Sequence, residues 1–164
     1  MRRMAVAALA ATLFLGVSEL SAQAKANFAG AWTRVDDPNA PPPTGRGGGR
    51  GGLGASAKIE QDAKALTIIR TTQAGETKAV YNLDGSDSKN MVAGRGGGAG
   101  TETVSKTKWD GNKLVITTNI TVAGNPAQQM MTMSLDASGN LLVESTATGR
   151  DGAPATTKTT YKKG

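Results

Sequence analysis

The chain contains few of the residue types that carry out catalysis. It has no His and no Cys, which excludes Ser-His-Asp triads, Cys nucleophiles and the usual His/Cys zinc sites. Pairs of carboxylates could still act as general acid and base, but most Asp residues fall in turns, where Asp is favoured for its bonds to nearby backbone amides. Those positions are Asp36, Asp37, Asp62, Asp84, Asp110, Asp136 and Asp151. The sequence therefore predicts no enzyme, no metal site and no cofactor.

One charged side chain shares the face of an apolar strand. In segment 65–72, alternation places Arg70 in phase with Leu66 and Ile68, and an inward guanidinium needs an anion or hydrogen-bond acceptors. One interpretation makes Arg70 the anchor for a small acidic ligand, with Tyr81 and Trp109 as further ligand-binding residues. The other places Arg70 at a strand end, with its head group extended to water.

A second basic feature is a Gly-Arg-Gly-Gly-Gly string that occurs twice, once at 45–49 and once at 94–98. Residues 47–52 also fit the Gly-x-Gly-x-x-Gly pattern of dinucleotide sites, but no strand precedes them and no helix follows, so that interpretation fails. The arginines concerned are Arg46, Arg50 and Arg95. They are either solvated loop residues or contacts for an anionic surface.

The net charge of the chain indicates which kinds of surface the loop arginines could contact. The formal net charge is +6, which favours weak, salt-sensitive contact with anionic lipid or polysaccharide. Arginines on flexible chain also occur in RNA-binding tails, but there they are combined with aromatic residues for base stacking, and the two strings contain none. We predict no nucleic-acid partner.

The regular structure is predicted to be entirely β. Segments 101–109 and 113–122 are rich in Thr, Val and Ile, which suit a pleated surface, and Asp110-Gly111-Asn112 between them indicates a hairpin. The same pattern of strand and turn recurs along the chain. Segment 27–35 is expected to hold a lead-in followed by a first strand. The other expected strands cover 57–61, 65–72, 77–83, 101–109, 113–122, 127–135, 141–148 and 155–161.

Sequential strands pair by default, so we expect an all-β, antiparallel up-and-down meander of about eight or nine strands. Closing the meander into a barrel would remove its exposed edges. The Gly-, Pro- and Arg-rich segments 36–55 and 86–100 are expected to be long disordered loops. The strand faces are apolar at one end and carry hydroxyl groups at the other, which predicts one filled end and one wetter mouth.

The first 24 residues have the form of a signal peptide. A basic start precedes an apolar run from Met4 to Val17, and Ala22-Gln23-Ala24 resembles a cleavage site. The remaining residues, 25–164, are expected to form one monomeric domain that is exported to the periplasm or the extracellular space.

Gly30-Ala31-Trp32 at the start of such a meander resembles the lipocalin-like, or calycin, barrels. The strings 58–62, 81–85 and 108–114 are also similar to those of small exported bacterial proteins that have lipocalin-like barrels and no assigned activity. The resemblance implies a closed barrel in which Trp32 packs at the closed end. It implies no particular function, and the C-terminal helix of true lipocalins is not recognisable here.

Two functional hypotheses follow from these features. In the first, a non-enzymatic barrel binds a small amphipathic or acidic molecule in its mouth. In the second, the protein is structural or associated with the cell envelope, and its Gly-Arg loops contact anionic lipid or polysaccharide. A ligand-sized cavity would favour the first hypothesis, and a packed interior with both loops at one rim would favour the second.

Overall fold

The computed structural model describes residues 25–35, 52–72, 75–92, 100–122, 124–148 and 153–164. These residues form a single antiparallel sheet of ten strands. The strands are β1 (Gly30–Arg34), β2 (Ser56–Gln61), β3 (Ala65–Thr72), β4 (Gly75–Asn82), β5 (Ser88–Val92), β6 (Thr101–Asp110), β7 (Lys113–Val122), β8 (Asn125–Leu135), β9 (Leu141–Thr148) and β10 (Pro154–Lys163).

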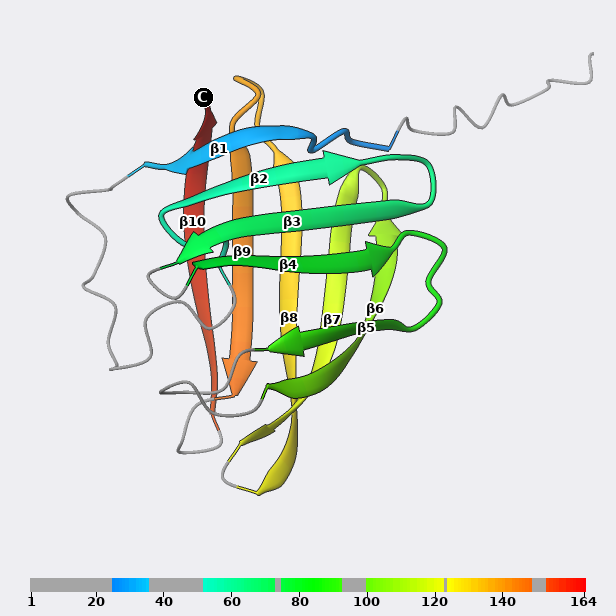
Figure 1. Ribbon diagram of the computed structural model, residues 1–164. Helices are drawn as coiled ribbons and strands as arrows, with labels where there is room; N and C mark the ends of the chain where they lie inside the picture. The colour runs from blue at the N-terminus through cyan, green and yellow to red at the C-terminus, as the bar shows by residue number, and fades with distance from the viewer. Residues whose placement is uncertain (1–24, 36–51, 73–74, 93–99, 123, 149–152) are drawn as a thin grey trace, which may run out of the picture.

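The sheet is a meander that nearly closes on itself. Its order is β4-β3-β2-β1-β10-β9-β8-β7-β6-β5, so the first strand pairs with the last and the two sheet edges are β4 and β5. Figure 1 shows β1 to β4 crossing in front of the longer strands β6 to β10, with β5 beside β4. The predicted all-β antiparallel meander is confirmed, and the described chain forms a nearly closed barrel.

The described residues form ten strands, whereas we predicted about eight or nine. The difference includes β5, which lies inside the segment 86–100 that we predicted to be a loop. Ser88–Val92 is short, contains no β-branched residue before Val92 and stands between an Asp-Gly turn and a Gly-rich string. Only its pairing with β6, from Ser88 opposite Ser105 to Val92 opposite Thr101, makes it a strand. Tertiary pairing here overrides a weak local preference.

The connections fall into two groups because every strand is antiparallel to its neighbours. The turns after β2, β4, β6 and β8 lie at one end, which we call the turn end. The connections after β1, β3, β5, β7 and β9 lie at the other, which we call the rim end. Both Gly-Arg strings fall in rim-end connections, but Arg46, Arg50 and Arg95 lie outside the described residues, as does the predicted signal peptide.

Asp side chains shape the turn-end connections, as the sequence predicted. In the turn after β2, one carboxylate oxygen of Asp62 accepts bonds from the backbone N–H groups of Lys64 and Ala65, at 2.7 Å each. Asp136 does the same for Ser138 and Asn140, at 2.8 and 2.9 Å. These bonds fix the turns locally, so these carboxylates have a structural explanation.

The core is concentrated toward the turn end. Its members are Phe28, Trp32, Leu53, Ala57, Ile59, Leu66, Ile68, Tyr81, Leu83, Leu114, Ile116, Met131, Met133, Leu141, Val143 and Tyr161. Trp32 is 2% exposed and its indole N–H donates to the Phe28 carbonyl at 2.8 Å, which confirms its predicted place in the core. Gly30, with φ +146°, leaves space for the Lys163 side chain to cross onto the Trp32 ring.

Side chains, rather than a backbone ladder, bridge β4 and β5. The Asn90 amide oxygen accepts from the Val80 N–H at 2.7 Å, and its NH2 group donates to the Val80 carbonyl at 2.9 Å. Further along, the Asn82 N–H donates to the Ser88 hydroxyl at 2.7 Å, and the Thr107 hydroxyl donates to the Asn82 carbonyl. These contacts close the barrel where its two edges meet.

Candidate functional site

Arg70 lies on the inward face of β3, as the alternation predicted. It stands opposite Ala57 of β2, which is buried, and in phase with the buried Leu66 and Ile68. Its side chain is half-buried, and in the described part of the chain its buried Nε–H has no hydrogen-bond partner. A buried donor without a partner is costly, so this group is the strongest sign of a missing acceptor in the interior.

Tyr81 of β4 approaches the Arg70 head group from the neighbouring strand. Burial raises the pKa of the Tyr81 hydroxyl, and the positive charge and hydrogen bonding of Arg70 offset part of that rise. The two groups therefore interact inside the barrel. This pair places one cationic and one hydroxyl group side by side, the combination that would hold an anion.

Trp109 does not join the pair. It faces inward from β6, next to the turn-end connection, and stacks on Phe28 with ring centroids 6.0 Å apart and an interplanar angle of 6°. Lys25 lies over its ring at 5.5 Å, and its buried indole N–H has no partner among the described residues. The three predicted ligand-binding residues are thus divided, with Arg70 and Tyr81 together and Trp109 in the turn-end packing.

Tyr161 of β10 is a residue of this site that the sequence analysis did not single out. It is 1% exposed, and burial raises the pKa of its hydroxyl, while the Leu53 N–H bond and the charges of Arg34 and Arg70 lower it in part. The alternation of side chains along the last strand places Tyr161 on the inner face, and this pattern could have identified it as an interior residue. The positive charge of Arg70 therefore acts on two buried tyrosine hydroxyl groups, those of Tyr81 and Tyr161.

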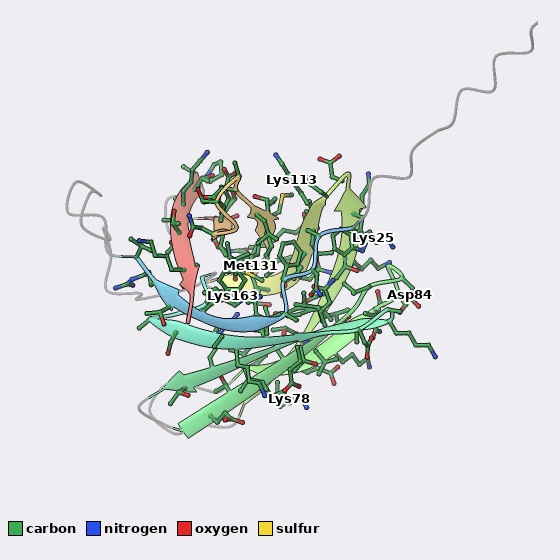
Figure 2. The ribbon with its side chains drawn as sticks, turned by 90° about the horizontal axis from the view of Figure 1, so that it is seen from above. Lys25, Lys78, Asp84, Lys113, Met131 and Lys163 are labelled. Atoms are coloured by element: carbon green, nitrogen blue, oxygen red, sulfur yellow. The ribbon has the colours of Figure 1, made fainter. Side chains whose placement is uncertain are left out.

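The inward face becomes polar toward the rim end. On β6 and β7, the row Trp109 and Leu114 is followed by Thr107 and Ile116, and then by Ser105 and Thr118. The last two hydroxyl oxygens are 2.8 Å apart, which is hydrogen-bonding distance, and Ser105 is 2% exposed. Figure 2 shows Met131 between the two halves of the barrel and Lys78 on the outside. The predicted division into an apolar end and a hydroxyl-lined end is confirmed on these strands.

A hollow of about 460 Å³ is lined by residues of β1 to β4, among them the buried Trp32 and Ala57. Its lining includes Lys58, Ile69 and Glu76, and it does not include Arg70, Tyr81 or Trp109. Lys58 is already paired with Glu60 at 2.7 Å. Because none of the three predicted ligand-binding residues lines it, this hollow is not the cavity that would have favoured our first hypothesis.

Among the described residues, His, Cys, Asp and Glu side chains do not gather into groups of three or more that could hold a metal ion. In the same part of the chain, no helix has the length and apolar character needed to cross a membrane.

Comparison with known proteins identifies the fold. No family model matches the chain, and no curated protein matches it. Among solved structures, it is similar to zebrafish ileal bile acid-binding protein in complex with cholic acid, with a TM-score of 0.57 and 19% sequence identity over 84% of this chain and 98% of that one. At this identity the likeness shows the fold alone, a nearly closed antiparallel β-barrel.

Proposed function

We propose that this protein binds a small acidic amphipathic molecule inside its barrel, without catalysing a reaction. The observation that carries the proposal is the Arg70 side chain, which faces inward with a buried Nε–H that has no partner in the described chain. A carboxylate would supply the missing acceptor, and a charged hydrogen bond of this kind contributes about 1.5–3 kcal/mol.

The surroundings of Arg70 suit both parts of such a ligand. Tyr81 offers a hydroxyl group that interacts with the guanidinium, and the apolar residues of the turn-end core extend from it along the interior. An amphipath would place its acidic group on Arg70 and its apolar body against that surface. The solved neighbour supports the proposal, because it is described as a bile acid-binding protein in complex with cholic acid.

The test is a binding titration with dodecanoate and, as a neutral counterpart, dodecanol. We expect dodecanoate to bind the full chain, and Arg70→Gln to weaken it by about 10- to 100-fold, the equivalent of one charged hydrogen bond. Dodecanol binding should change little. The matched control is Lys78→Gln, which removes the same charge from the outward face of β4, beside the partner of Arg70.

The controls separate a bound ligand anchor from general electrostatics. If Lys78→Gln weakens dodecanoate binding as much as Arg70→Gln does, the effect is long-range charge and not an anchor. If Arg70→Gln leaves dodecanoate affinity unchanged while the protein stays folded, the guanidinium does not hold the anion and the proposal is wrong.

We also propose that residues 1–24 direct export and that a monomer beginning at Lys25 is the mature form. The support is the sequence pattern of a basic start, an apolar run and Ala22-Gln23-Ala24. Intact mass measurement of protein recovered outside the cytoplasm tests this. Full-length protein retained in the cytoplasm would refute it.

Contact with an anionic surface is a second candidate function. The observation that favours it is topological, since the connections that contain Arg46, Arg50 and Arg95 all leave from the rim end. Vesicles containing phosphatidylglycerol should sediment the protein at low salt and release it at high salt. Replacing the three arginines by Gln should abolish sedimentation, whereas Lys64→Gln combined with Lys113→Gln, at the turn end, should not.

A further inference from the structure

Leu53 is the unexpected member of the core. It is the one large apolar residue in a Gly-rich stretch that we predicted to be surface loop, yet it is 0% exposed. It precedes β2 and belongs to no strand. A segment that could have remained in solvent therefore places its one apolar side chain inside the barrel.

Tyr161 holds this segment from within the barrel. The Leu53 N–H donates to the Tyr161 hydroxyl at 3.1 Å, and that hydroxyl donates to the Gly54 carbonyl at 3.1 Å. Gly54 has φ +85°, a conformation that side-chain-bearing residues rarely adopt. One buried hydroxyl thus satisfies two adjacent backbone groups of a segment that lies outside the sheet ladder.

The segment lies beside the cluster around Arg70. The charges of Arg34 and Arg70 both act on the Tyr161 hydroxyl, and Arg34 donates its backbone N–H to the Ala55 carbonyl at 2.9 Å. Ala57, opposite Arg70, continues the same chain into β2. Leu53 therefore lies in the same buried cluster as Tyr161 and as Ala57, the residue opposite Arg70.

We propose that the segment Gly52–Ala55 is an internal latch, in which Leu53 occupies the ligand's apolar space and the Tyr161 hydroxyl holds it there. The proposal rests on the acidic-ligand function above. A ligand then binds only to molecules in which Leu53 has withdrawn, so the measured affinity is reduced by the small fraction that is open.

Two variants test the latch through different atoms. Leu53→Ala removes the occupant, and Tyr161→Phe keeps the ring but removes the hydroxyl that holds the segment. We expect each to bind dodecanoate at least five-fold more tightly than the unmodified chain. Each should also bind N-phenyl-1-naphthylamine, an uncharged fluorescent probe, more tightly. In Tyr161→Phe, hydrogen exchange at the Leu53 amide should become at least ten-fold faster.

Leu83→Ala is the control for general loosening of the core, since Leu83 is buried in the turn-end connection after β4. It should not strengthen binding of either probe. If it does so as much as Leu53→Ala, or if Leu53→Ala and Tyr161→Phe stay folded and bind both probes no more tightly than the unmodified chain, the latch is wrong. Weaker binding by Leu53→Ala would also overturn it, because Leu53 would then be a wall of the site.

The uncharged probe separates failure of the latch from failure of the proposed function. If the latch variants strengthen binding of the uncharged probe while Arg70→Gln has no effect on dodecanoate, the latch holds and the anionic anchor is wrong. If Arg70→Gln weakens dodecanoate binding and the latch variants change neither probe, the anchor holds and the latch is wrong.

Discussion

Replacing Asn90 by Ala tests how the barrel closes. The Asn90 amide makes two bonds with one residue of the opposite edge, 2.7 Å to the Val80 N–H and 2.9 Å to the Val80 carbonyl, as a backbone peptide would. A net 0.5–1.5 kcal/mol for each bond gives about 1–3 kcal/mol. Both bonds are exposed, so water replaces them in part and we expect a loss of about 1–2 kcal/mol in the free energy of unfolding.

The assay combines urea unfolding with hydrogen exchange at the Val80 amide. Ala at position 90 should lower the unfolding midpoint and leave the Val80 amide open to exchange. Asn90→Asp retains an acceptor for the Val80 N–H but no donor for its carbonyl, so its stability should be intermediate and the Val80 amide should stay protected.

Met91→Ala is the matched control, because Met91 is the next residue along β5 and is 64% exposed. It should change the free energy of unfolding by less than about 0.5 kcal/mol. If Asn90→Ala behaves like Met91→Ala and the Val80 amide remains protected, then Asn90 does not hold the two edges together, and the contacts of Asn82 with Ser88 and Thr107 must close the barrel.

Three other perturbations have expected outcomes. Trp32→Ala should destabilise the fold by about 3–5 kcal/mol in urea unfolding, as large-to-small core changes do; an unchanged midpoint would place Trp32 outside the core. Gly30→Ala should lower the melting temperature, because Gly30 has φ +146° and a Cβ there would lie 2.6 Å from the Lys163 Cε. In a Lys163→Ala background the same change should cost less. If the loss is the same in that background, strain at the backbone angle φ alone is responsible. Backbone hydrogen bonds hold the pKa of Asp62 below its usual 3.8, and hydrogen bonds from Asn140 do the same for the pKa of Asp136. The contribution of these carboxylates to stability is therefore present above that pH and is lost as the pH falls below it. Asp136→Asn should reduce this acid sensitivity, and melting curves from pH 6 to pH 2.5 that coincide for the variant and the unmodified chain would refute the assignment.

The sequence predicts those parts of the fold that local chemistry determines. Asp-Gly and similar turn signals predict the turn-end connections, and alternation predicts the inward faces, including the face that carries Arg70. Strand β5 could not be found this way, because its residues have no strong strand preference and its pairing with β6 decides its state. Which strands form the two edges is also a property of the closed sheet and not of any local segment.

The candidate site was predictable only in part, for a related physical reason. Phase along β3 puts Arg70 inside, but it does not say which side chains reach it from other strands. Tyr81 was named and lies near it, whereas Trp109, with the same aromatic character, packs on Phe28 at the turn end. Leu53 was missed because its burial depends on a hydroxyl more than 100 residues away in sequence, that of Tyr161.

The two ends of the barrel differ in what their connections can tolerate. Turn-end connections such as Asp62 to Ala65 are short and held by their own side chains, and they cover a core that includes Trp32 and Leu114. A change there costs stability. At the rim end, the described segment 52–55 is held by the Tyr161 hydroxyl and by one backbone bond, from the Arg34 N–H to the Ala55 carbonyl. Because a weakly held segment can move without breaking the sheet, the rim end is where binding can be regulated while the barrel stays intact.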